Sequence, residues 1–214
     1  VTGDIDLWSV RPSDGLSQQL TRNAGSNNVN PAVSSDGQYI FFESNRSGKR
    51  HIWRIGINGE NPTQITFSEK EEEFYPTISA DGSWLYYVQR NGNGNFVSRK
   101  SLVDGKTETI TEQGKFSPNT LLSLSPDGNY LAFHNIADVG DDDAPRRTTE
   151  LGVVSLREQN RVKIHTLPLL GGTFLWTADG SAYDYVVNTR EGGMVQRRTL
   201  DEPSEARTVM TIPN

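Results

Sequence analysis

The feature that most constrains this chain is a sequence unit that recurs about every 45 residues. Four segments, SSDGQYIFF, SADGSWLYY, SPDGNYLAF and TADGSAYDY, share one order: a small polar residue, Asp-Gly, then an aromatic-rich run. Their aspartates, Asp36, Asp81, Asp127 and Asp179, lie 45, 46 and 52 residues apart. Two further series keep this period: the turns Asp14-Gly15, Asn58-Gly59 and Asp104-Gly105, and the pairs Leu20-Thr21, Ile65-Thr66 and Ile110-Thr111. Three markers in one order at one period indicate a repeated structural unit.

Each unit is predicted to form four β-strands. Asp-Gly and Asn-Gly favour hairpin turns because these residues tolerate positive φ. In the best-preserved copy we expect strands at Pro31–Ser34, Tyr39–Glu43, His51–Ile57 and Thr63–Thr66. Helical periodicity is absent throughout. Four-stranded units of this length cannot bury both faces alone and stack radially, so the sequence predicts an all-β propeller of four-stranded antiparallel blades.

The phase of the repeat gives about four and a half blades. We expect a single propeller domain over residues 1–214, with a half blade at 1–21 and full blades at 22–66, 67–111, 112–167 and 168–214. A propeller closes by pairing its first and last blades, which leaves no exposed edge. We therefore expect either a fragment of a ring of six or more blades or a chain that takes strands from another chain. The start at Val1-Thr2-Gly3, without Met, agrees with a piece of a longer polypeptide.

The markers of the second unit resemble the TolB-type β-propeller repeat. They are Pro31, Ser34, Asp36-Gly37, Asn45-Arg46, Gly48, Ile52-Trp53, Asn58-Gly59 and Gln64-Ile65-Thr66. The resemblance is sharp from Ile5 to Thr111 and looser from Asn135 onward. It specifies a fold better than a function, because the family includes colicin-import proteins, receptor sensor domains and peptidase gating domains.

This resemblance implies a non-enzymatic module that binds a protein or senses a ligand. We expect it to be part of a larger bacterial protein, such as a membrane-anchored regulator or a kinase, and to lie in the periplasm or otherwise outside the cytoplasm. Two alternatives stay open. One is a periplasmic TolB-like scaffold, and the other is the propeller of a peptidase or lyase whose catalytic residues lie outside this segment.

Catalytic and metal-binding patterns are not found in the sequence. There is no Gly-x-Ser-x-Gly nucleophile elbow, and Asn91–Asn95 has the composition of a hairpin tip rather than of a phosphate loop. The three histidines, His51, His134 and His165, occupy non-equivalent positions of their units, which argues against a shared metal site. The chain has no cysteine and therefore no thiolate ligand. We expect no catalytic residue, metal or cofactor.

The predicted binding surface is the face that carries the connections between units, where loops of neighbouring blades converge. The Asp-Gly turns lie at the opposite end and are interpreted as folding devices. The candidate binding residues are Asn28, Asn30, Glu73, Tyr75, Asn119 and Trp176. Trp8, Trp53 and Trp84 are instead expected to pack between blades.

The charge of the chain narrows the choice of partner. A formal net charge of −6 repels phosphate backbones, so we expect no nucleic acid partner through this segment. No apolar run is long enough for membrane insertion. Two acidic segments, Phe67–Tyr75 and Asn135–Arg147, lack the ligand spacing of a calcium loop and are interpreted as solvated. Together they suggest a protein or peptide partner that is basic.

Overall fold

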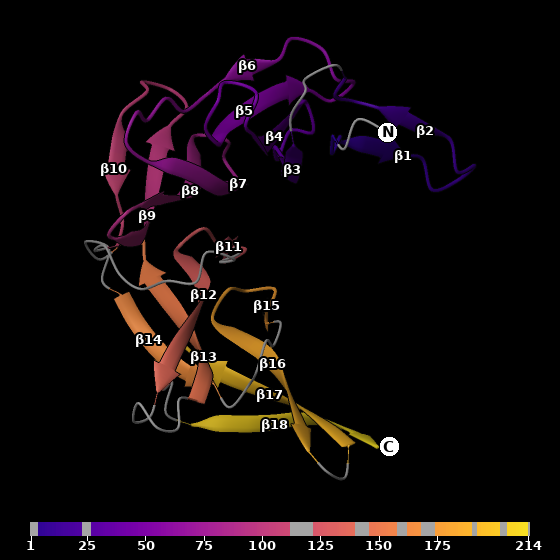
Figure 1. Cartoon of the computed structure of the whole chain (residues 1–214). Helices are drawn as coiled ribbons and strands as arrows, with labels where there is room; N and C mark the ends of the chain where they lie inside the picture. Colours follow the sequence, from indigo (N-terminus) through magenta and orange to yellow (C-terminus); the bar gives the residue numbers. More distant parts are fainter. Residues whose placement is uncertain are drawn as a thin grey trace. The chain divides into compact units, whose positions relative to one another are not determined.

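A computed structural model describes residues 4–22, 27–111, 122–139, 146–157, 162–167, 174–189, 192–201 and 205–213. Every regular element in these residues is a β-strand (Figure 1). The chain divides into two compact units, Val1–Gly114 and Lys115–Asn214, and each is described by itself. A single domain over residues 1–214 therefore stays a prediction.

The first unit contains one two-stranded and two four-stranded antiparallel sheets (Figure 1). Strands β1 (Trp8–Val10) and β2 (Ser17–Gln19) pair with each other. The next sheet has the order β3 (Asn28–Val33), β4 (Tyr39–Ser44), β5 (His51–Gly56) and β6 (Thr63–Gln64). The following sheet consists of β7 (Glu72–Ile78), β8 (Trp84–Asn91), β9 (Gly94–Ser101) and β10 (Thr107–Thr109). Within each sheet, strands that are consecutive in sequence pair with each other.

The second unit contains two further sheets of the same kind. One consists of β11 (Leu122–Leu124), β12 (Tyr130–Val139), β13 (Arg146–Ser155) and β14 (Val162–Leu167). The other consists of β15 (Phe174–Trp176), β16 (Ala182–Thr189), β17 (Gly192–Thr199) and β18 (Ala206–Pro213). The long hairpin β12–β13 pairs from Tyr130 with Ser155 to Val139 with Arg146, which accounts for the extra length of this repeat. The prediction of four-stranded antiparallel blades is confirmed.

The Asp-Gly turns owe their regularity to one hydrogen-bonded motif. In each turn a hydroxyl two residues before the aspartate donates to its Oδ1 over 2.5 to 2.6 Å. The same Oδ1 accepts the backbone N–H two residues later, over 3.0 to 3.1 Å. The glycines have φ between 69° and 72°, a region that side chains with a Cβ rarely adopt. These are Gly37, Gly82, Gly128 and Gly180.

The threonine of the Leu/Ile-Thr pairs has a structural role that the sequence repeats faithfully. The buried hydroxyl oxygens of Thr21, Thr66 and Thr111 accept backbone N–H groups over 2.9 to 3.0 Å. The donors are Leu7, Ile52 and Val97, which lie near the start of the neighbouring strand of the same sheet. A buried N–H without such a partner is costly, so the third repeat marker is explained by a hydrogen bond.

The hydrophobic cores lie between consecutive sheets rather than within one sheet. Phe42 and Ile40 of β4 pack against Leu7 and Leu20 on one side. Their neighbour Phe41 packs on the other side with Leu85 and Tyr87 of β8. A third core in the second unit joins two sheets; its members are Ala132, Leu151, Val153, Phe174, Tyr183, Tyr185 and Leu200. Both faces of a central strand are therefore buried, as blade stacking requires.

The predicted packing of the tryptophans between blades is wrong for Trp8. Its side chain is 57% exposed, whereas Trp53, which has the matching position in β5, packs on the first core. Phe42 of β4 stands opposite Trp53 in the strand pairing. In the described residues β1 pairs only with β2, where Gln19 stands opposite Trp8, so no strand on the other side of β1 corresponds to β4. Trp84 is half-buried beneath the guanidinium of Arg99, which lies 4.2 Å from the ring centroid.

Candidate functional site

The candidate site lies at the end of the first unit's strands that is opposite the Asp-Gly turns. Here the hairpin between the second and third strands of one blade contacts the first strand of the next. The backbone N–H of Glu73 donates to the carbonyl of Arg50 in the preceding blade over 2.9 Å. Within one blade, the Asn27 N–H donates to Asn45 Oδ1 in the hairpin loop over 2.8 Å. We call residues 27–30, 43–51, 71–75 and 90–91 the loop face of the first unit.

Two β-bulges shape this face. The register shifts between Val29 and Ala32 in β3 and between Phe74 and Thr77 in β7. The residue before proline in each bulge, Asn30 or Tyr75, has a φ of 52°. Asparagine tolerates this left-handed region, but for tyrosine it costs about 1–2 kcal/mol. The sequence predicts the first strand of this unit at Pro31–Ser34, whereas β3 begins at Asn28 and continues through the bulge to Val33.

A buried carboxylate holds the two bulges together. The side chain of Glu43 in β4 is 1% exposed, and its Oε1 accepts a 2.7 Å hydrogen bond from Asn30 Nδ2. The same oxygen accepts the backbone N–H of Tyr75 over 2.8 Å. Arg50 Nη1 donates to Oε2 over 3.1 Å. Three groups from two blades thus compensate the burial of one charge, which would be expensive without partners.

Asn28 and Glu73 have equivalent positions in consecutive units and tie adjacent blades together. Asn28 is buried, and its Nδ2 donates to Asp6 Oδ1 over 3.1 Å. Glu73 is also buried, and its Oε2 lies 2.7 Å from His51 Nδ1. Both bonds reach the beginning of the third strand of the preceding blade. These side chains therefore form the wall of the loop face rather than its outer surface.

The half-exposed part of this face is built around Tyr75 and two arginines. The rings of Phe74 and Tyr75 lie 6.3 Å apart. The guanidinium groups of Arg50 and Arg90 lie 5.9 and 4.5 Å from the Phe74 centroid, and Arg90 pairs with Glu72 over 2.7 Å. Burial raises the pKa of the Tyr75 hydroxyl, the Glu43 carboxylate adds to this, and the two arginines oppose it. The tyrosine therefore stays protonated at neutral pH and can act as a hydrogen-bonding aromatic contact.

The acidic segment Phe67–Tyr75 is partly neutralised by its neighbours. Glu72 and Glu73 are engaged by Arg90 and His51. Glu71 accepts hydrogen bonds from Ser68 and Asn91, both uncharged. Neither Glu69 nor Glu71 forms an ion pair within the described part of the chain, so these two carboxylates supply the charge that the segment presents.

The structure brings three of the six predicted binding residues together around Glu43 and His51: Asn30, Glu73 and Tyr75. Asn28 lies on the same face but bonds to Asp6 and Arg46. Trp176 belongs to the second unit, where it is half-buried and makes edge contacts with Phe174 and Tyr183 at 6.1 and 6.3 Å. Asn119 lies outside the described residues.

Sequence reasoning missed Glu43, Arg50 and Arg90. Glu43 was detectable, because it is the one acid in the run YIFFES, where the next unit has Val88 at the same distance from its Asp-Gly turn.

The backbone pairing places two of the histidines in one sheet. In the backbone pairing His134 of β12 and His165 of β14 both stand opposite Leu151 of β13. Of the segment Asn135–Arg147, residues 140–145 lie outside the described residues. Among the residues that the structure describes, no group of three His, Asp or Glu side chains could hold a metal ion. The described elements also include no helix long and apolar enough to cross a membrane.

Comparison with protein families gives one match, to the family described as the TolB beta propeller domain, over residues 1–169. An uncharacterised protein of Agrobacterium fabrum is 30% identical over 142 residues, which are 60% of this chain and 46% of that protein. A TolB homolog of Chlorobium chlorochromatii is 30% identical over 78 residues, 36% of this chain and 18% of the homolog. The matched parts thus make up less than half of either curated relative.

Solved structures share the fold at lower identity. TolB from Acinetobacter baumannii superposes with a TM-score of 0.68 and 17% identity, over 92% of this chain and 47% of that one. The acylaminoacyl peptidase of Pyrococcus horikoshii gives a TM-score of 0.65 and 14% identity, over 87% of this chain and 32% of the peptidase. The fold therefore occurs both in TolB and within an enzyme's chain.

Proposed function

Because the chain belongs to the TolB β-propeller domain family, we propose that it is a non-enzymatic binding module that engages a protein or peptide through the loop face of its first unit. The family match supports a binding module, and the geometry described above supports the choice of the loop face. A ligand-sensing role for the same face is included in this proposal, with a peptide as the preferred ligand.

The observation that carries the proposal is the conformation of Tyr75. A tyrosine at a φ of 52° is strained, and its backbone N–H is fixed by a buried carboxylate from the neighbouring blade. Strain of this kind persists where the surroundings hold it, and it collects at binding sites. The result is a half-exposed aromatic side chain on a fixed backbone, next to the Phe74 ring over which Arg50 and Arg90 lie. Rigid aromatic and arginine side chains are the usual anchors of protein interfaces.

Within this proposal the partner contributes basic residues. Support comes from Glu69 and Glu71, whose carboxylates form no ion pair in the described residues, although Lys49 Nζ donates to the backbone carbonyl of Glu69. Attraction of this kind acts across an exposed surface, so it weakens as salt screens it. A partner held mainly by Tyr75 and its bordering arginines would bind with little salt dependence instead.

We place the module in a larger bacterial protein outside the cytoplasm. The support is the family membership and the fact that the chain matches less than half of each curated relative. The second candidate is the propeller of a peptidase or lyase, favoured by the structural likeness to an acylaminoacyl peptidase. In that case the catalytic residues would lie in another part of the protein. Turnover of peptide, ester or pectate by the 214-residue chain, abolished by one point mutation, would argue against the non-enzymatic proposal.

Peptides selected from a random library on the purified chain provide the test. We compare their affinity for the wild type with that for the Tyr75→Asn variant by fluorescence polarisation. Asparagine accepts the left-handed backbone, so the bulge is retained while the aromatic contact is lost. We expect affinity to fall at least tenfold, about 1.4 kcal/mol.

The matched control is Tyr39→Asn. Tyr39 also has an arginine over its ring, Arg54 at 4.4 Å, but it lies beside the Asp36-Gly37 turn at the opposite end of the blade. Peptide binding should be unchanged in this variant. Binders whose chemical-shift footprint is confined to the Asp36, Asp81 and Asp127 turns would contradict the assignment of the loop face.

A further inference from the structure

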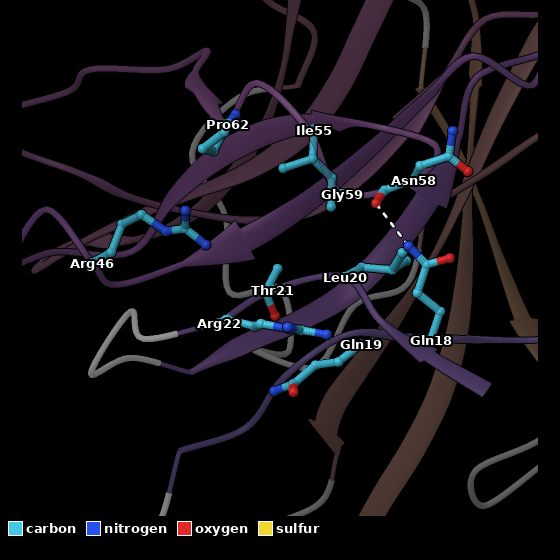
Figure 2. A pocket seen from close by; sticks show the side chains of 10 residues that line it. All are labelled: Gln18, Gln19, Leu20, Thr21, Arg22, Arg46, Ile55, Asn58, Gly59 and Pro62. Carbon is cyan, nitrogen blue, oxygen red and sulfur yellow. Dashed lines mark hydrogen bonds between the residues drawn. The ribbon is translucent and has the colours of Figure 1, made fainter.

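A cavity separate from the Tyr75 surface opens between the first two sheets. It has a volume of about 440 Å³ and lies between β2 and the hairpin that joins β5 to β6 (Figure 2). Its walls carry Gln18 and Arg22 on one side and Arg46 and Asn58 on the other. No acidic residue is among the described residues that line it. In a chain with a net charge of −6, a cavity lined by two arginines and no acid is unexpected.

The guanidinium of Arg46 is held in place by uncharged groups. It lies 4.8 Å from the Trp53 centroid and 5.2 Å from that of Phe42. Its Nε donates to Ser44 Oγ over 3.0 Å and its Nη2 to Asn28 Oδ1 over 2.8 Å. Within the described residues Nη1 has no partner. A planar guanidinium fixed in this way presents a preorganised edge with spare donors.

Within the described residues the guanidinium of Arg46 forms no ion pair. Asp6 attracts it electrostatically, but the Asp6 carboxylate accepts hydrogen bonds from neutral donors: Thr21 Oγ1 at 2.6 Å, Gln19 Nε2 at 2.9 Å and Asn28 Nδ2 at 3.1 Å. Three other arginines that lie over aromatic rings, Arg50, Arg90 and Arg99, each pair with a glutamate. Arg46 is half-buried and, like Arg54, forms no ion pair within the described residues, so an anion would complete the coordination of its guanidinium.

The cavity is a built feature rather than a gap between sheets. Gln18 Nε2 donates to the carbonyl of Asn58 over 3.1 Å, so the two walls are joined (Figure 2). At Gly59 a Cβ would lie 2.6 Å from the carbonyl oxygen of Leu20, and φ is +91°. Only glycine permits this close approach of the hairpin to β2. The volume is within the range of small-molecule sites, about 300–1,000 Å³.

We propose that this cavity binds a small organic anion through its carboxylate or phosphate group. The anion contacts the open edge of Arg46, and Arg22 adds a second positive charge. Gln18 Nε2 already donates to the Asn58 carbonyl, so the second N–H and the Oε1 of this amide are the groups that can bond to the rest of the bound anion. Carboxylate and phosphate both match the planar donor pattern of a guanidinium, so the chemistry is shared between the two classes. This site does not include Tyr75, but it shares Arg46 with the loop face, where Arg46 Nη2 donates to Asn28.

Isothermal titration calorimetry of the 214-residue chain with succinate and with inorganic phosphate, at low ionic strength, tests the proposal. We expect saturable binding of at least one anion, and the preferred probe identifies the class. Arg46→Gln should weaken binding at least tenfold. Arg54→Gln is the control, because Arg54 also stacks on an aromatic ring, yet it does not line the cavity. Its affinity should match the wild type.

Arg46→Gln also removes packing on Trp53, so a second variant keeps the test decisive. Gln18→Glu places a negative charge at the cavity mouth, on an exposed side chain, and should lower affinity at least tenfold while the unfolding midpoint stays unchanged. The proposal is overturned if neither anion binds the wild type saturably. It is also overturned if Arg46→Gln or Gln18→Glu binds the anion as tightly as the wild type.

Discussion

At the residue scale, Glu43 shows how one side chain departs from the repeat and creates a local property. The matching position of the next unit is Val88 of β8, a buried apolar side chain of the kind that the pattern predicts. In its place Glu43 brings a carboxylate into the same environment and gathers Asn30, Arg50 and the Tyr75 N–H around it. The contacts of an isolated charge in an apolar strand cannot be read from the strand itself, because its partners come from another blade.

Truncation of Glu43 tests whether it holds the two bulges together. Glu43→Ala leaves the Arg50 guanidinium and the Tyr75 N–H without their acceptor, so the free energy of unfolding should fall by about 2–3 kcal/mol. Glu43→Gln keeps an acceptor oxygen and should cost about half as much. Urea unfolding gives both values. The control is Glu108→Ala, which breaks the more exposed Arg99–Glu108 pair and should cost less than about 1 kcal/mol. Equal losses in the two alanine variants would contradict the role of Glu43.

At the scale of the element, the hairpin turns were predictable and the bulges were not. Asp-Gly at a fixed place before an aromatic run specifies both the turn and its register, because the glycine must take positive φ. Asn30-Pro31 and Tyr75-Pro76 contain no such unambiguous signal. Proline there agrees equally with the start of a strand and with a bulge inside one. Since the bulges direct Asn30 and Tyr75 to Glu43, the contacts of the candidate site could not be derived from the sequence, although four of its residues were.

The Asp-Gly turns make the free energy of unfolding depend on pH in the acid range. Hydrogen bonds from Ser79 and Ser83 lower the pKa of Asp81, and bonds from Thr177 and Ser181 lower that of Asp179, in both cases to about 2 from 3.8. Above pH 3.8 both carboxylates are ionised in the folded and unfolded chain, and their contribution is complete. Between pH 3.8 and 2 the unfolded chain binds protons first, so stability falls with pH, and below pH 2 the contribution is lost.

Urea unfolding at successive pH values between 5 and 2 measures this effect, with an approximate unfolded pKa near 4 as reference. A double variant, Asp81→Asn and Asp179→Asn, retains an oxygen acceptor in each turn but has no proton to gain. Its stability should therefore fall less steeply with pH than that of the wild type. Identical slopes for the two proteins would show that these turns do not contribute to the acid sensitivity.

At the scale of the whole molecule, stability resides between sheets, and this determines how the chain should unfold. The core around Phe42 belongs to the first unit and the core around Tyr183 to the second, and they share no residue. The repeat predicts stacked blades, but it does not reveal whether their cores unfold together. That depends on free energies at individual interfaces, which the markers at turns and strand ends do not encode.

Hydrogen exchange of two core variants addresses this question. Phe42→Ala should cost about 3–5 kcal/mol, because it removes a fully buried ring from the first core. If the units unfold separately, amides of β4 and β5 lose protection while those of β16 and β17 keep it. Tyr183→Ala should give the reverse pattern, since its ring is fully buried in the second core. Equal loss of protection in both units, in either variant, would instead show that the 214 residues unfold as one cooperative domain. We expect separate responses, because each described core is completed by side chains of its own unit.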